Sequence, residues 1–149
     1  MSASNNFEND ILLLVFNNTN IANIGDATGL RGSTTAGSLY VALHTADPGE
    51  GGTQNTNETT YTGYARVGVA RSGSGWTVSG TAPTQAANTS TITFGTSTSG
   101  TPTITHFSVG YESSGATKIV ASGALNNSQV INIGGTNTFA ASALTVTCD

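Results

Sequence analysis

The residues best suited to chemistry gather in one stretch of the sequence. The segment SLYVALHTADPGEGGTQ, residues 38–54, ends an apolar run on His44 and continues into a loop that holds Asp47 and Glu50, and Glu58 follows in the same polar region. Histidine can act as a general base, and two carboxylates can act as acid and base in glycoside hydrolysis. Carboxylates are also the oxygen ligands that Ca²⁺ prefers. This stretch is therefore the first candidate for a catalytic site or a cation site.

The pattern around these residues favours architecture over catalysis. A hydrolytic nucleophile needs a base beside it and a third group that orients the base, and no G-x-S-x-G elbow accompanies His44 or His106. The loop around the carboxylates consists of Gly, Thr, Asn and Gln, which we expect to leave them solvated. We predict that His44 closes a strand and that Pro48 and Gly49 reverse the chain after it. No catalytic residue is predicted.

Metal and cofactor sites are weakly supported. The spacing of the acidic residues matches no EF-hand, and His44, His106 and Cys148 lack the spacing of zinc ligands. The glycine stretches lead into loops or strands and not into a helix, so they do not predict a phosphate loop. We expect no cofactor. One alternative stays open, a cation bound by the carboxylates of Asp47, Glu50 and Glu58.

Composition excludes several classes of partner. The chain has 149 residues, 8% charged residues, a net charge of −4 and a single cysteine, Cys148, so no intrachain disulfide can form. Too few cations are present to neutralise a run of phosphates, and we expect no nucleic-acid partner. The longest apolar run, residues 11–16, is too short to cross a membrane. We therefore expect a soluble chain. The four basic residues are Arg31, Arg66, Arg71 and Lys118.

The elements that would hold the site are short strands. Apolar and polar residues alternate in runs bounded by Gly, Asn, Pro or Ser, as in TITHFSVGY, residues 103–111. About eight such runs predict an all-β fold, an antiparallel β-sandwich or jelly roll over residues 38–149, with an immunoglobulin-like sandwich as the alternative. The runs span residues 39–44, 61–71, 76–79, 90–94, 103–111, 117–124, 129–133 and 144–147.

The first 37 residues predict a short helix followed by an extended arm for assembly or docking. The helix should begin at Asn5 as N-cap, with Glu8 completing a capping box, and end near Asn17. Its apolar residues surround the helix, a pattern typical of burial on more than one side. We predict a subunit or docking interface formed by Phe7, Ile11, Leu14, Val15 and Phe16.

The aromatic residues have two interpretations. Tyr61, Tyr64, Trp76 and Tyr111 could form a platform on which sugars stack. In a small sandwich such residues more often pack in the core and across strands, which we expect here.

A resemblance to a known family lies in residues 39–71. The segment LYVALHTADPG, a polar gap that holds Glu58, and YTGYARV resemble a recurrent segment of tailed-bacteriophage virion proteins, described as tail-fibre-like or as capsid decoration (cement) proteins. The resemblance implies a non-enzymatic virion component that assembles as a homotrimer. It transfers no catalytic residue.

Three functions follow as hypotheses. We expect a decoration protein that binds the major capsid protein on the outer surface of the head and stabilises the shell through multivalent contacts, because the chain is one short unit without repeats. The alternative is a tail-fibre adhesin that binds host glycan through Tyr61, Tyr64 or Trp76. A glycan-active enzyme using Asp47 with Glu50 or Glu58, or a β-sandwich module without a virion role, is less favoured.

Overall fold

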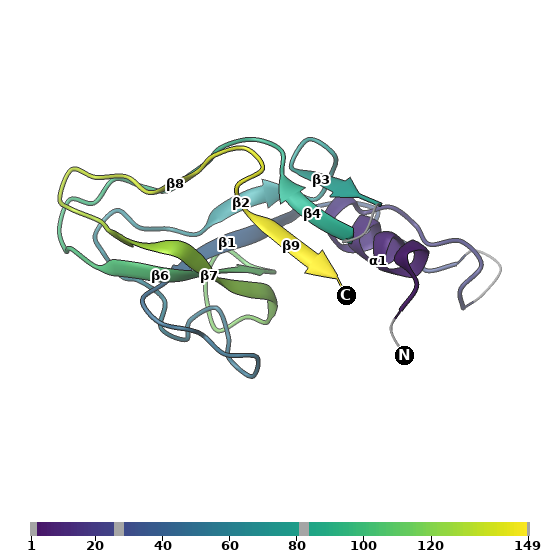
Figure 1. Cartoon of the computed structure of the whole chain (residues 1–149), viewed down its shortest axis with the longest axis horizontal. Helices are drawn as coiled ribbons and strands as arrows, with labels where there is room; N and C mark the ends of the chain where they lie inside the picture. The colour runs from purple at the N-terminus through teal and green to yellow at the C-terminus, as the bar shows by residue number, and fades with distance from the viewer. Residues whose placement is uncertain (1–2, 26–28, 81–83, 149) are drawn as a thin grey trace. The chain divides into compact units, whose positions relative to one another are not determined.

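The chain folds as antiparallel β-sheets with one N-terminal helix (Figure 1). The computed structural model describes residues 3–25, 29–80 and 84–148. The predicted all-β class with a short N-terminal helix is confirmed. No helix in the described ranges has the length and apolar character that a membrane crossing requires. The elements are α1 (Asn5–Asn17), β1 (Ser38–His44), β2 (Val67–Ala70), β3 (Trp76–Ser79), β4 (Thr84–Asn88), β5 (Ile92–Thr93), β6 (Thr103–Gly110), β7 (Ile119–Val130), β8 (Thr138–Phe139) and β9 (Thr145–Cys148).

Two compact units are formed by separate parts of the chain. The helix unit comprises Met1–Gly37, Val69–Thr91 and Phe139–Asp149, and the network unit comprises Ser38–Gly68 and Ile92–Thr138. The predicted division placed only residues 1–37 apart from a sandwich of residues 38–149. The step between residues 37 and 38 is common to both divisions, while two later segments group with the N-terminal one. The sheet orders are β2-β1-β6-β7, β3-β4-β9 and β5-β8.

The helix α1 is capped at both ends by short polar side chains. Ser4, and not the predicted Asn5, is the N-cap, and its Oγ accepts from the backbone N–H of Phe7 at 3.4 Å. Asn18 ends the helix in the left-handed conformation with φ of 57°, and its N–H donates to the carbonyl of Leu13. The Asn18 side chain then binds both backbone groups of Ser33. The helix ends where predicted.

One face of α1 is buried within the helix unit. Glu8, Leu12 and Phe16 are the buried helix residues, a spacing of four that places them on one face. Phe16 packs edge-on against Trp76 with ring centroids 4.9 Å apart. Helix α1 lies against β3 and β4 of the same unit (Figure 1). The sequence alone does not identify this face, because residues 11–16 are all apolar.

Arg71 binds the C-terminal end of this helix. Its Nε donates to the carbonyl of Val15 at 2.7 Å and its Nη2 to the carbonyl of Leu14 at 2.8 Å. Nη1 reaches the carbonyl of Ala36 at 3.2 Å. The last carbonyls of a helix lack intrahelical donors and carry partial negative charge. One guanidinium therefore completes the helix end and holds the following loop.

Two strands, β4 and β8, were not predicted from the sequence pattern. β4 reads TQAAN, with little apolar character, yet it pairs with both β3 and β9. Asn88 at its end is fully buried; its amide donates to the carbonyls of Ser90 and Ala140 and accepts from the N–H of Leu144. Backbone pairing and one amide hold this strand in place of large apolar side chains.

The network unit is built on β1 and β6. These strands pair antiparallel with Tyr40 opposite Gly110 and His44 opposite His106. The core beside them is aliphatic and almost completely buried: Leu39, Val41, Leu43, Ile104 and Val109. β7 pairs with the other edge of β6 across residues that the sequence pattern divided into two strands. This rigid frame positions the loop that follows β1.

Candidate functional site

His44 closes β1, as predicted, but it is a buried residue with two hydrogen bonds. Its ring is fully buried, with Nδ1 2.8 Å from the carbonyl of Thr56 and Nε2 2.8 Å from Oγ of Ser108. A carbonyl can only accept, so Nδ1 carries the proton and Nε2 accepts from the serine hydroxyl. Burial lowers the pKa of His44, since the charged ring would lose its hydration. The imidazole is therefore neutral in the folded protein.

Gln54 extends these contacts from the histidine to an arginine. Its Nε2 donates to the carbonyl of Tyr40 at 2.9 Å and to Oγ of Ser108 at 3.4 Å. Its Oε1 accepts from Oγ1 of Thr117 at 3.0 Å and from Nη1 of Arg66 at 3.3 Å. All four hydrogen-bonding positions of the amide are thus in use. We call His44, Gln54, Glu58, Tyr64, Arg66 and Ser108 the polar network.

The arginine of the network forms a bidentate pair with a carboxylate. Nε and Nη2 of Arg66 each lie 2.7 Å from an oxygen of Glu58, and the two side chains are 2% and 14% exposed. Nη2 also donates to Oδ1 of Asn55 and to the carbonyl of Gly115, and Nη1 donates to the carbonyl of Glu112. The hydrogen bonds that Arg66 donates to the Glu58 carboxylate raise the pKa of Arg66, so it stays charged. This guanidinium ties residues 54–58 to residues 112–115.

Tyr64 completes the surroundings of the carboxylate. Its hydroxyl donates to Oε1 of Glu58 at 2.9 Å and accepts from the backbone N–H of Leu43 at 3.0 Å. Burial raises the pKa of Tyr64 well above that of a free phenol. Both oxygens of Glu58 are therefore occupied by fixed donors. The expectation that Glu58 is a solvated loop residue was wrong, because folding brings Arg66 and Tyr64 onto it.

A serine and a histidine lie within hydrogen-bonding distance, but not as an accessible nucleophile and base. Ser108 and His44 are both fully buried, and the group that orients the ring is the backbone carbonyl of Thr56. A substrate carbonyl has no path to this hydroxyl in the described structure. The pair is therefore a structural contact between β1 and β6. The sequence analysis missed Ser108, although its place on the polar face of the 103–111 run was the available signal.

The acidic residues considered for a cation do not converge. Asp47 and Glu50 are exposed, and Oδ1 of Asp47 accepts from the N–H of Gly49 at 2.8 Å within its own turn. Glu58 is paired with Arg66. Across residues 3–25, 29–80 and 84–148, no group of three or more His, Cys, Asp or Glu side chains could hold a metal ion.

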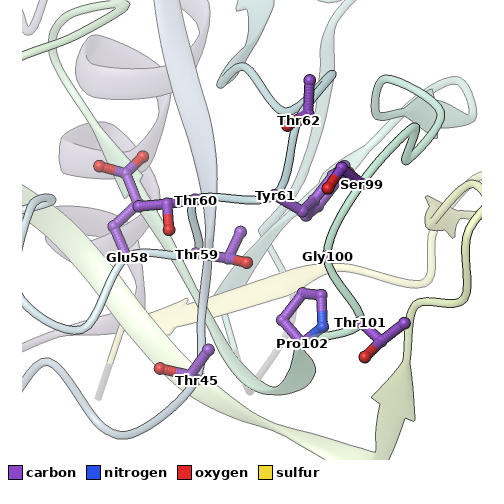
Figure 2. A pocket seen from close by; sticks show the side chains of 10 residues that line it. All are labelled: Thr45, Glu58, Thr59, Thr60, Tyr61, Thr62, Ser99, Gly100, Thr101 and Pro102. Carbon is purple, nitrogen blue, oxygen red and sulfur yellow. The ribbon is translucent and has the colours of Figure 1, made fainter.

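A shallow groove lies on the surface of the network unit beside this network. It has a volume of about 530 Å³. Residues 58–62 supply one side and residues 99–102 the other, and Thr45 also lines the groove (Figure 2). Six of its ten lining residues carry hydroxyl groups on Thr or Ser: Thr45, Thr59, Thr60, Thr62, Ser99 and Thr101. Hydroxyl groups therefore dominate this surface.

The comparisons bear on the whole chain. The family model described as Podophage GP4 fiber I protein gp80 matches residues 2–147. The chain belongs to this family. A search of curated proteins found no match. The resemblance to phage virion proteins is thereby supported at the level of a fibre-type virion structural protein, and the family description favours the fibre alternative over capsid decoration.

In this member of the fiber I family, the quoted motif residues form the polar network. YTGYARV supplies Tyr64 and Arg66, and LYVALHTADPG supplies His44. Tyr61 of the motif donates from its hydroxyl to the carbonyl of Gly95 at 2.9 Å. The motif therefore specifies how the loop after β1 is fastened.

The aromatic platform suggested for a fibre adhesin is not formed by the residues proposed. Trp76 is completely buried and Tyr61 is 5% exposed. Tyr64 packs between the rings of Tyr61 and Phe94, at centroid distances of 5.4 and 6.1 Å. Only Tyr111 of the four is widely exposed. The expectation of core and cross-strand packing describes the other three.

The five residues predicted as an interface have different surroundings in this fiber I protein. Phe16 is buried against Trp76. Phe7 is 43% exposed, and Ile11, Leu14 and Val15 are half-buried. Their role as an interface stays a prediction. Phe16 has a defined place inside the helix unit.

Proposed function

We propose that this protein is a tail-fibre component through which a podophage attaches to polysaccharide on its host. The observation that carries the proposal is the fiber I family match across residues 2–147. A compact sheet unit with a fastened surface loop is compatible with repeated, reversible attachment. Localisation in the virion follows from the same family.

The geometry supports attachment without turnover. A glycosidase needs one protonated carboxyl group and one free carboxylate about 5–10 Å apart across the bond it cleaves. Glu58, the least exposed of the three acidic candidates, has its charge balanced by Arg66 at 2.7 Å. Both oxygens of this carboxylate are engaged by Arg66, and Oε1 is also engaged by Tyr64, so neither is free to act on a glycosidic bond. We therefore assign the chain a binding role.

The helix unit offers a surface for joining the rest of the virion. Phe7 is a large apolar residue with 43% of its surface exposed, and Ile11 follows one turn later. A second copy of the chain in a homotrimer, or another fibre component, would cover this edge of α1. Deleting residues 1–16 would remove the buried Phe16 as well. Phe7→Asp tests the surface without disturbing that core.

Capsid decoration is the second candidate. The exposed Phe7 edge would serve equally for docking on the major capsid protein at the outer surface of the head, and several weak contacts would then stabilise the shell together. This reading predicts affinity for heads and none for cells. The fibre reading predicts the reverse.

One experiment separates the two functions. The labelled full chain is mixed with host cells and, separately, with purified heads that lack it, and bound protein is measured after sedimentation. We expect saturable binding to cells. Binding to heads at a fixed ratio to capsid subunits, without binding to cells, would replace the fibre proposal by capsid decoration. If the wild type binds cells, Phe7→Asp should retain that binding and lose incorporation into the particle; if the wild type binds heads instead, Phe7→Asp should weaken head binding.

A further inference from the structure

We propose that the groove formed by residues 58–62 and 99–102 binds a neutral, polyhydroxylated sugar. This inference rests on the proposed function, because it names the site and ligand class for attachment. The groove volume of about 530 Å³ is within the range of small-ligand sites, about 300–1,000 Å³.

Hydroxyl groups make the surface suitable for a ligand that both donates and accepts hydrogen bonds. Each Thr or Ser hydroxyl has one donor and two acceptor positions and rotates to suit its partner. Sugar hydroxyls have the same dual capacity. Thr60, Thr62, Ser99 and Thr101 are all exposed, so a ligand can reach these residues from solvent.

The charge of the groove selects against ions. Glu58 is the only charged residue in the lining, and both of its oxygens are engaged by Arg66. Figure 2 shows its carboxylate pointing away from the Thr59 and Pro102 side chains. Arg66 itself is buried with a 2% exposed side chain, so it presents no charge to an anion. A neutral ligand therefore fits better than a phosphate or an acidic glycan.

The floor of the groove contains a polar group with unused capacity. Thr59 is 2% exposed, and its Oγ1 has no hydrogen-bond partner among the described residues. A buried hydroxyl without a partner is unfavourable. A ligand hydroxyl seated over Thr59 would relieve this. Beside it, the half-buried ring of Pro102 provides an apolar surface for the C–H groups of a sugar.

The two sides of the groove are held in fixed positions. The N–H of Thr62 donates to the carbonyl of Ser99, and the N–H of Thr98 donates to that of Thr62, both at 2.9 Å. Gly63 adopts a φ of 102°, and a Cβ there would lie 2.1 Å from the carbonyl oxygen of Thr96. Only glycine permits this close approach. A groove prepared before binding loses little conformational entropy when a ligand enters.

The test uses ¹⁵N-labelled full-length protein and NMR titration. The probes are the neutral and the acidic fractions of partly hydrolysed surface polysaccharide from the bacterium on which the phage grows. Thr101→Trp fills the groove from an exposed position, and Thr145→Trp places the same bulk on an exposed residue of β9. We expect the neutral fraction to shift the amides of residues 58–62 and 99–102. Thr101→Trp should weaken binding by about tenfold or more and Thr145→Trp should leave it unchanged.

Four other outcomes of the titration would contradict the groove assignment. Absence of shifts with the neutral fraction, shifts outside the groove, preference for the acidic fraction, or unchanged affinity in Thr101→Trp would each overturn the groove assignment. Sedimentation with host cells distinguishes the two proposals. Wild-type binding to cells together with any of those results refutes the groove and keeps the adhesin, whereas failure of the wild type to bind cells refutes the adhesin itself.

Discussion

Arg66 in the network unit and Arg71 in the helix unit both fasten loops, but with different partners. Arg66 pairs with the carboxylate of Glu58 and is almost completely buried. Arg71 is half-buried and donates to the carbonyls of Val15, Leu14 and Ala36. Removing Arg66 would leave a charge uncompensated, whereas removing Arg71 would leave neutral carbonyls without this donor.

This difference shows how a chain with four basic residues uses them. Side chains with five donors can satisfy many backbone carbonyls at once, which matters where loops replace regular pairing. The ion pair additionally makes its unit sensitive to the loss of either partner. We expect the two units to respond unequally to equivalent substitutions.

The largest effect is expected for Arg66→Met. It leaves Glu58 partly buried without its counter-ion, which should lower the free energy of unfolding by about 3–5 kcal/mol. Urea unfolding of the full chain measures this. Arg31→Met, at an exposed position, should change stability by no more than about 0.5 kcal/mol. Adding Glu58→Gln to Arg66→Met should recover part of the loss, and no recovery would show that the ion pair is not the cause.

A smaller effect is expected for Arg71→Met. The carbonyls of Val15 and Leu14 lose their donors, which should cost about 1–3 kcal/mol. Hydrogen exchange should increase first in the last turn of α1, since the substitution frays the helix end. If Arg71→Met were as damaging as Arg66→Met, the distinction between carboxylate and carbonyl partners would fail.

The neutral His44 predicts a pH dependence confined to the network unit. Burial lowers its pKa below the reference value of 6.5, so below that pH the unfolded chain takes up a proton that the folded chain does not. Stability should therefore decrease as pH falls through 6.5, by no more than about 1.4 kcal/mol per pH unit for one proton. The loss should level off below the folded pKa. Thermal unfolding between pH 8 and pH 4 should show a steeper loss of stability in the wild type than in His44→Gln.

The smallest effect is expected at the helix N-terminus. Ser4→Ala removes the acceptor for the N–H of Phe7 and should cost about 0.5–1 kcal/mol. Ser4→Asp should retain the cap and add a favourable charge at the helix N-terminus. Circular dichroism during urea unfolding distinguishes the two. Equal stability of Ser4→Ala and wild type would mean that this cap does not contribute to the helix unit.

The sequence predicted the elements with regular patterns. Alternation identified β1, β3 and β6, and the apolar run after residue 5 identified α1, since period and capping residues are local properties. It missed β4, where TQAAN carries no apolar alternation. The sequence pattern also divided β7 into two strands. None of its residues is buried, so its two faces do not differ in the apolar and polar residues that alternation would reveal.

Local sequence alone determined that this chain is a charge-poor β-protein with a short helix, and the motif of residues 39–71 indicated its phage family. Only the tertiary structure decided which hydrogen-bond partners the residues capable of chemistry would have. His44, Glu58 and Ser108 acquire their roles from Arg66, Gln54 and one another, across separations of up to 64 residues. Such contacts depend on how strands pair and loops close, and sequence spacing carries no information on either.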